Sequence, residues 1–385
     1  MKKEKIIYSL LMPMIVFFFS CKEKYVPSVA NSNLNYLTVD GFLNNSSDSA
    51  FIRLSRTRNL DSSLLNSGEN GAELTIEDSS GNAIYYFRQL NNNGMYTLPG
   101  MNLNVNNKYK LRIKTVSGGE YLTDEIPVLR TPPIDSISWK KSDKGVTIYT
   151  NTHDPLNNTK YYRWNYTETW QYHSTYISRL KYDSTSLPYK VSGRPDSEFL
   201  YTCWIEQNSK DLLLATSTKL SQDVISENPI RFISNNSIEL SVKYSIAARQ
   251  YALTKEAYEY LQNLKKNTEQ TGSIFDAQPS ELKGNIHSVS NPNEPVLGYI
   301  TISSVDSARI YISNSEVTPW VWGLNCAQIL VPLNSDSTEL YFNHLGYIPL
   351  EPYNSSPFSP IWAALTPCGD CTVNRGTTKK PGFWP

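Results

Sequence analysis

The 385-residue sequence lacks the short motifs that mark common catalytic sites. It contains no G-x-S-x-G nucleophile elbow, no H-E-x-x-H zinc motif, no P-loop and no G-x-G-x-x-G dinucleotide fingerprint. Its four histidines (His153, His173, His287 and His344) have no metal-ligand spacing. The sequence therefore predicts a protein that is not an enzyme and has no catalytic residue, metal or other cofactor. A carboxylate pair assembled by folding, as in glycosidases, leaves no local motif and stays open as an alternative.

The sequence also lacks an excess of charge. It has 36 basic and 36 acidic residues, so its formal net charge is zero. Nucleic-acid binding proteins usually gather a basic excess on one face, and this balance argues against a nucleic-acid partner. After the N-terminal segment, no apolar run approaches the roughly twenty residues that span a bilayer. We therefore expect a water-soluble body.

The N-terminal segment has the layout of a signal peptide. "MKKEKIIYSLLMPMIVFFFSC" places three lysines before an apolar run, which ends at Ser20-Cys21. We interpret residues 1–20 as a lipoprotein signal peptide and Cys21 as the acylated lipid anchor; an ordinary secretory signal with an incidental cysteine is the alternative. The polar residues 21–33 then form a tether linker.

Cysteines are few: apart from Cys21 there are Cys203, Cys326, Cys368 and Cys371. An even number in an exported protein predicts disulfides, and four cysteines allow three pairings. The simplest prediction is a Cys368–Cys371 bridge in the terminal Cys-x-x-Cys, with Cys203 bonded to Cys326. A crossed pairing, in which Cys326 bonds to a tail cysteine, remains open. A redox motif and a metal site are further alternatives, but the motif does not open a helix in a βαβ setting.

Residues 34–131 have the pattern of a small antiparallel β-sandwich, immunoglobulin-like or transthyretin-like. Short strand-like runs such as "YLTVDGFL" and "AFIRLSRT" alternate with turns, and "AELTIEDSSGNAIYYF" has a hairpin turn at Ser80-Gly81. In "KYKLRIK", Tyr109, Leu111 and Ile113 alternate with basic residues, which indicates one buried and one solvated face. Pro132-Pro133 should end the domain, because proline cannot continue a ladder.

Residues 134–385 should form a larger β-rich domain that ends in the Cys-x-x-Cys tail. In "YYRWNYTETWQY", alternate positions place aromatics and Glu168 on one face, which favours a core over a ligand-binding surface. "SIELSVKYSI" also reads as a strand. One amphipathic helix is predicted in "LTKEAYEYLQNLKKNTEQTG", with Thr254 as its N-cap and Gly272 beyond its end.

The Cys21 junction, "YLTVDGFL", "YYRWNYTETW" and the terminal "CGDCTVNRGTTKKPGFWP" together resemble a family of outer-membrane lipoproteins of unknown function in the Bacteroidota, often encoded beside TonB-dependent receptors. The resemblance extends over nearly the whole mature chain. Arg375 replaces one glycine of a usual pair. The positions that match the terminal motif are a structural signature: Cys368, Asp370, Cys371, Gly376, Lys380, Pro381, Phe383 and Trp384.

The resemblance implies a non-enzymatic lipoprotein on the outer membrane, anchored by lipid and facing the cell exterior. Its expected partner is a TonB-dependent barrel, for which it would act as a lid or capture substrate. The alternative is a stand-alone cell-surface adhesin or binding module that holds glycan or peptide.

Overall fold

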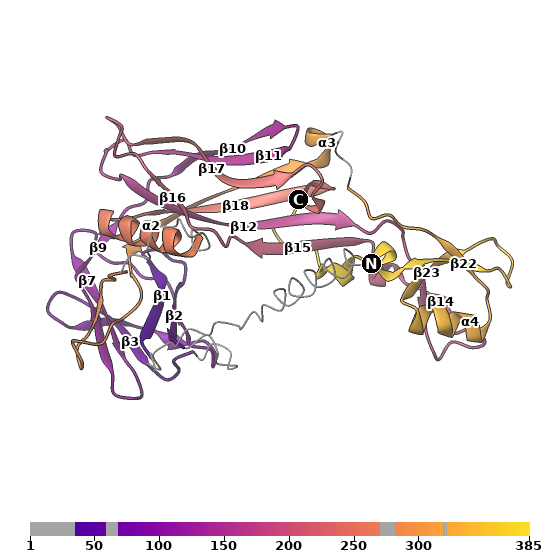
Figure 1. The fold of residues 1–385 in the computed structure, drawn as a ribbon, viewed down its shortest axis with the longest axis horizontal. Helices are drawn as coiled ribbons and strands as arrows, with labels where there is room; N and C mark the ends of the chain where they lie inside the picture. Colours follow the sequence, from indigo (N-terminus) through magenta and orange to yellow (C-terminus); the bar gives the residue numbers. More distant parts are fainter. Residues whose placement is uncertain (1–34, 59–67, 270–281, 319, 321) are drawn as a thin grey trace, which may run out of the picture. The chain divides into compact units, whose positions relative to one another are not determined.

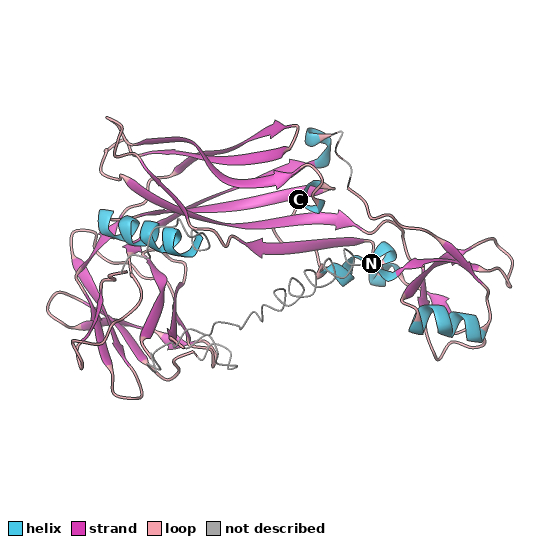
Figure 2. Cartoon of the chain, viewed as in Figure 1, coloured by secondary structure: helices cyan, strands magenta, loops and turns pink. Residues whose placement is uncertain are grey.

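The computed structural model describes residues 35–58, 68–269, 282–318, 320 and 322–385. Strands dominate these residues and most helices are short, so the predicted mainly-β class is confirmed (Figure 2). The expected signal peptide, Cys21 and the tether linker lie outside the described residues. Among the residues that are described, no helix has both the length and the hydrophobicity needed to cross a membrane.

The N-terminal sandwich surrounds one core with a continuous path of hydrogen-bonded strands. The path runs β19-β8-β7-β9-β20-β1-β2-β6-β5, and β3 joins both β7 and β4. The predicted alternation in β7 is confirmed, because Tyr109, Leu111 and Ile113 are buried. The strands contributed by the start of the chain are β1 (Leu37–Asn44), β2 (Ala50–Arg56), β3 (Glu73–Glu77), β4 (Ala83–Tyr86), β5 (Arg88–Gln89), β6 (Met95–Leu98), β7 (Lys108–Lys114), β8 (Glu120–Thr123) and β9 (Ile126–Leu129).

Two strands of this sandwich come from much later in the chain, so the predicted boundaries of residues 34–131 are incomplete. β19 (Ile286–Ser288) pairs with β8, and β20 (Ile302–Ser303) lies parallel between β1 and β9. Ile286, Ile300 and Ile302 are buried in the same core as β1 and β2. β19 is three residues long and β20 is two residues long. Only pairing with distant partners makes such short segments strands.

The central sandwich packs two sheets around an aromatic core. The first sheet has the order β10-β11-β17, and the second has the order β15-β12-β18-β21 with β16 also beside β12. Its strands are β10 (Ile134–Ser142), β11 (Gly145–His153), β12 (Tyr161–His173), β15 (Thr202–Asn208), β16 (Leu213–Thr216), β17 (Val224–Ser234), β18 (Lys243–Ala252) and β21 (Val305–Ser313).

The aromatic residues of β12 belong to this core, as the sequence favoured. Tyr162 and Trp164 are fully buried and stack with ring centroids 5.6 Å apart. Glu168 lies on the same face and is only 2% exposed. Its carboxylate accepts hydrogen bonds from Arg231 Nε at 2.9 Å and from the Tyr244 hydroxyl at 2.8 Å. Arg231, whose side chain is partly buried, therefore balances the charge of this buried carboxylate.

The predicted helix is α2 (Lys255–Glu269), which lies across one end of the central sheet (Figure 1). The Thr254 hydroxyl accepts a hydrogen bond from the Ala257 amide, as expected of an N-cap. Gly272 lies outside the described residues. The strand predicted for residues 237–246 is wrong in its first half: Ile238–Leu240 form a 3-10 turn, η3, and β18 begins at Lys243. The turn buries Leu240 without extending the backbone.

Residues 134–385 contain a second core in addition to the aromatic one. The C-terminal module consists of the β13-β14 ribbon and a β22-β24-β23 sheet with short helices, and it packs around Ile348, Leu350, Ala364 and Cys368. One predicted domain therefore divides into two cores. The elements of this module are β13 (Leu180–Tyr182), β14 (Val191–Gly193), η2 (Asp196–Glu198), β22 (Ile329–Val331), α4 (Ser335–Glu339), η4 (Leu340–His344), β23 (Tyr347–Pro352), β24 (Ile361–Leu365) and α5 (Thr366–Gly369). α3 (Asn314–Val317) and η5 (Cys371–Asn374) instead place Val317 and Cys371 in the aromatic core.

Candidate functional site

The four described cysteines form two nested disulfides. The outer disulfide joins Cys203 on β15 to Cys371, across 168 residues, and the inner disulfide joins Cys326 to Cys368, across 42 residues. The prediction that all four are oxidised is confirmed. The simplest pairing is wrong, and the crossed pairing that the sequence left open is the one that forms.

The two tail cysteines bond to different partners because they belong to different cores. Cys368 lies in α5 and is buried in the core of the C-terminal module. Cys371 lies in η5 and is buried in the aromatic core of the central sandwich. Asp370 separates the two helical turns in an extended conformation. The Cys-x-x-Cys motif is therefore the point at which the two cores are fastened together.

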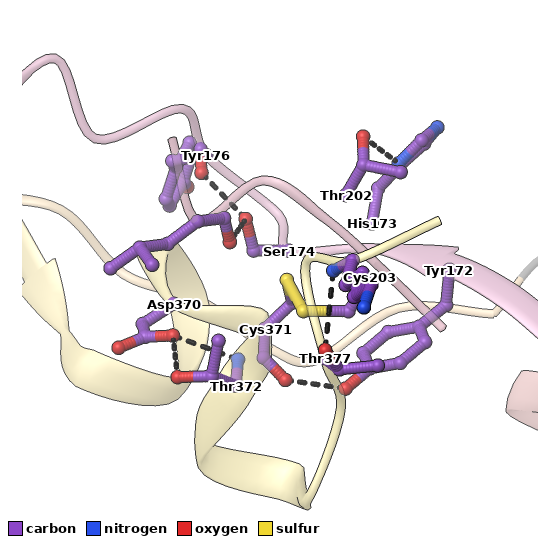
Figure 3. Close-up of a disulfide and its surroundings, with 12 residues drawn as sticks. Tyr172, His173, Ser174, Tyr176, Thr202, Cys203, Asp370, Cys371, Thr372 and Thr377 are labelled. Carbon is purple, nitrogen blue, oxygen red and sulfur yellow. Dashed lines mark hydrogen bonds between the residues drawn. A yellow bond between two sulfur atoms is a disulfide. The ribbon is translucent and has the colours of Figure 1, made fainter. Parts of the chain in front are cut away.

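Hydrogen bonds hold the chain around the outer disulfide (Figure 3). The Tyr172 hydroxyl donates to the backbone oxygen of Cys371. The Asp370 carboxylate accepts from the backbone amide and the hydroxyl of Thr372, at 2.8 and 2.6 Å, and so caps η5. The role of Asp370 is that of an N-cap, which satisfies an amide at the start of the turn.

Gly376 and Arg375 shape the turn that follows. A Cβ atom on Gly376 would lie 2.8 Å from Cys203 Cβ and closer still to the Tyr172 hydroxyl, so no side chain fits there. Arg375 has φ of 66°, in the left-handed region that glycine adopts most readily. Arg375 therefore adopts a left-handed turn although it is not a glycine.

The tail then pairs with the edge of the central sheet. The backbone amide of Trp204 on β15 donates to Thr377 at 2.9 Å, and the Thr377 amide donates back at 2.9 Å. An exposed strand edge is a template for pairing with other chains, and this bridge occupies part of the β15 edge.

The last residues attach to the outer face of the same sheet. Trp384 is 6% exposed, and its indole nitrogen donates to Gln171 on β12 at 3.2 Å. Tyr311 on β21 donates to the backbone oxygen of Phe383 at 2.7 Å, and the Arg309 guanidinium lies 3.8 Å from the Phe383 ring centre. Lys380 is exposed, and the backbone oxygen of Pro381 accepts from the Trp384 amide. Sequence reasoning identified the motif residues but missed these contacts on β12 and β21, which depend on the sheet register.

The two disulfides and the tail contacts around them, together called the clasp, have a structural role. Disulfide-bonded sulfurs supply no thiolate nucleophile. In the described part of the chain, no three His, Cys, Asp or Glu residues are placed to hold a metal ion. His153 and His287 pair with single carboxylates, Asp135 at 2.8 Å and Asp124 at 2.9 Å. His173 stacks on Tyr201, and burial lowers its pKa.

Three hollows adjoin the connector between the sandwiches, and two of them have mainly apolar linings. One, of about 420 Å³, is lined by Pro132, Pro133, Leu156 and Leu253, among others. The other, of about 220 Å³, lies beside Tyr299 and Thr254 at the start of α2. Both share Leu129. The connector itself is fixed, because Gln250 on β18 donates to the Pro132 oxygen at 2.9 Å.

Fold and clasp together define a β-rich, sandwich-like protein whose C-terminal tail is fastened by two disulfides. The chain belongs to the family described as "Domain of unknown function (DUF4249)", whose family model matches residues 22–309. The match includes both sandwiches and ends before the terminal motif. The matched residues include Cys203 but not Cys326 or the terminal motif, so the family model does not extend over the whole of the expected resemblance.

Solved structures resemble the chain weakly. A structure of manganese lipoxygenase of Gaeumannomyces graminis with partial zonadhesin of Komagataella pastoris is 10% identical over 58% of this chain and 91% of that chain, with a TM-score of 0.17. Trypsin-activated alpha-2-macroglobulin from Escherichia coli is 7% identical over 80% of this chain and 17% of its own, with a TM-score of 0.19.

A tetra-tandem repeat of a large adhesion protein is 12% identical over 76% of this chain and 51% of its own, with a TM-score of 0.15. TM-scores this low carry no argument about fold or function. No curated protein matches the chain.

Proposed function

We propose that this protein is a non-enzymatic, lipid-anchored lipoprotein of the outer-membrane surface that partners a TonB-dependent barrel, as a lid or as a substrate-capturing subunit. Two features support this proposal: the signal-peptide layout that ends at Cys21 and the exposed surface of the C-terminal module. Anchoring at Cys21 confines the protein to the membrane, where a membrane partner is met at high effective concentration.

The exposed apolar side chains of the C-terminal module carry this proposal. Phe358 is 73% exposed and Tyr353 is 54% exposed; Leu330, Leu340, Leu345 and Leu365 of the same module are each between 43% and 51% exposed. Large apolar side chains gathered on one small module are typical of protein-docking surfaces, in which a few aromatic anchors supply most of the binding free energy. The inner and outer disulfides fasten this module, so a partner would contact a firmly attached element.

Mild detergent extraction followed by affinity purification tests the proposal. We expect a large outer-membrane barrel to co-purify with the wild-type protein, and the Phe358→Asp variant to recover much less of it. Val116→Asp is the matched control, because Val116 is 76% exposed but lies on the N-terminal sandwich. Recovery of the monomer alone, together with full protection from protease added to intact cells, would contradict the proposal and favour the stand-alone binding module.

Anchoring is tested separately by Cys21→Ala. The variant should leave the membrane fraction, and retention of the variant after a carbonate wash would contradict the lipid anchor.

A further inference from the structure

The outer face of the central sheet carries a diagonal row of arginines. Alternate residues of β12 point away from the aromatic core, and strand register places Arg163, Arg249 and Arg309 on this outer face. Arg163 pairs with Tyr251, two residues beyond Arg249; Arg309 pairs with Ala247, two residues before Arg249. Each arginine is therefore a diagonal neighbour of the next, about 7–8 Å away across adjacent strands. We call these three side chains the arginine row.

The positive charge of the arginine row is not balanced by ion pairs. Within the described residues, none of its guanidinium groups has a carboxylate within 4.0 Å; Arg249 donates to the Thr167 hydroxyl at 3.0 Å and Arg309 to the Ser245 hydroxyl at 2.9 Å. Glu206 is the single carboxylate that these five strands place on the face, and it is exposed. Burial lowers the pKa of Arg309; Tyr311 and the Glu206 carboxylate oppose this effect, and the positive charge of Arg249 adds to it. Neighbouring like charges are destabilising in a sheet, so this arrangement is unfavourable without an anion.

The surface between the arginines is mixed in character. Ala247 and Ser307 are small, whereas the Tyr251 ring lies opposite Arg163 and packs edge-on against Phe42, with ring centroids 4.6 Å apart. The Asn165 amide on the same face donates to the Tyr251 hydroxyl at 3.0 Å. Aromatic rings lie at both ends of the row: Tyr161, which packs on Tyr258 of α2 with centroids 5.1 Å apart, and Phe383 of the tail, stacked on Arg309. Guanidinium groups set among aromatic rings match an acidic sugar chain, whose carboxylates pair with guanidinium groups and whose ring faces stack on aromatics.

We propose that the arginine row binds an acidic polysaccharide, with successive carboxylates of the chain paired to successive guanidinium groups. Arginine presents a planar fork that fits a carboxylate through two parallel hydrogen bonds. An acidic protein segment fits less well, because protein interfaces depend on apolar anchors, and the Tyr251 ring on this face is already packed against Phe42. This binding goes beyond the proposed barrel partnership and does not depend on it.

Binding of soluble protein to immobilised polygalacturonate and alginate tests the proposal. We expect binding that weakens as salt rises, and about a tenfold loss for Arg163→Gln or Arg249→Gln, since each removes one charge-assisted contact. The double variant should lose binding altogether. Arg88→Gln is the matched control, because Arg88 is an exposed arginine on β5 of the N-terminal sandwich. Circular dichroism checks that each variant is folded.

Three outcomes would overturn the proposal: absence of binding to both polyuronates, equal binding of the double variant, or tighter binding to polyglutamate than to either polysaccharide. The last would assign the arginine row to an acidic protein. The assay uses no barrel, so its failure leaves the proposed partnership to its own test.

Discussion

Glu168 offers the sharpest test of how the central sandwich is stabilised. Its buried carboxylate is compensated by Arg231 and by the Tyr244 hydroxyl, and Arg231 also contacts Glu239 at 3.3 Å. Glu168→Ala removes the acceptor and leaves a partly buried guanidinium and a buried hydroxyl facing a cavity. Breaking a buried ion pair in this way costs about 3–5 kcal/mol of unfolding free energy.

The size of that cost is judged against two other variants. Glu198→Ala breaks the exposed pair with Lys181, whose charged atoms are 2.7 Å apart, and should cost under about 1 kcal/mol. The triple variant Glu168→Leu, Arg231→Met, Tyr244→Phe removes Glu168 together with both of its partners, and Glu239 keeps the hydrogen bond that it accepts from the Ser237 hydroxyl. It should recover most of the stability, because an apolar replacement of similar volume avoids uncompensated burial.

Urea denaturation followed by tryptophan fluorescence provides the measurement, since Trp164 and Trp170 lie in the same core as Glu168. A cost for Glu168→Ala that is no larger than that of Glu198→Ala would refute the view that the pair is buried and compensated. A triple variant as unstable as Glu168→Ala would refute the view that uncompensated charge causes the loss.

Three further predictions follow from the clasp and the core. Peptide mapping without reduction should recover the crossed disulfides, and a bridge within the Cys-x-x-Cys motif would contradict this pairing. Replacing the cysteines by serine should lower the unfolding free energy by about 5 kcal/mol for the outer disulfide and about 4 kcal/mol for the inner one. These values follow from the chain entropy of loops of 168 and 42 residues. Gly376→Ala should lower the unfolding free energy by about 1–3 kcal/mol through overpacking, and it should expose Trp384 to a fluorescence quencher. Gly382→Ala is the control, because a Cβ atom at Gly382 would meet open space, and it should change neither the stability nor the quenching. Equal behaviour of the two variants would contradict the packing argument. Burial raises the pKa of Tyr166 to about 12 from its usual 10.0, so the unfolded chain loses this proton first. The stabilisation that this shift contributes is therefore complete below pH 10 and lost as pH rises from 10 to 12. Tyr166→Phe should remove this part of the pH dependence of the unfolding free energy, and an unchanged pH dependence would contradict the prediction.

Local patterns predicted the long strands well. Alternation in β7 and β12 identified their buried faces, because a strand with one face in a core must place apolar residues at every second position. The spacing of apolar residues in α2 and its Thr254 cap identified the helix for the same kind of reason. These features depend on residues close together in the sequence.

Features set by distant parts of the chain were not predictable in this way. β20 is a strand because it lies between β1 and β9, and its two residues carry no pattern of their own. The disulfide pairing depends on which core receives each tail cysteine, and three residues of sequence spacing cannot indicate that two different cores are involved. The arginine row is likewise a product of register: β12, β18 and β21 each show one arginine at a solvent-facing position, and only their pairing makes the three neighbours.

The tail determines how much of the arginine face stays open. Thr377 pairs with Trp204 at the β15 edge, and Phe383 and Trp384 then cover the outer face near Gln171 and Tyr311. Arg309 lies at the border of this covered area, because its guanidinium is stacked on Phe383. The outer disulfide holds the start of the same tail beside β15. Loss of that disulfide should therefore weaken polyuronate binding through Arg309 while leaving Arg163 and Arg249 in place, which makes the clasp a positioning element for the proposed ligand as well as a stabiliser of the fold.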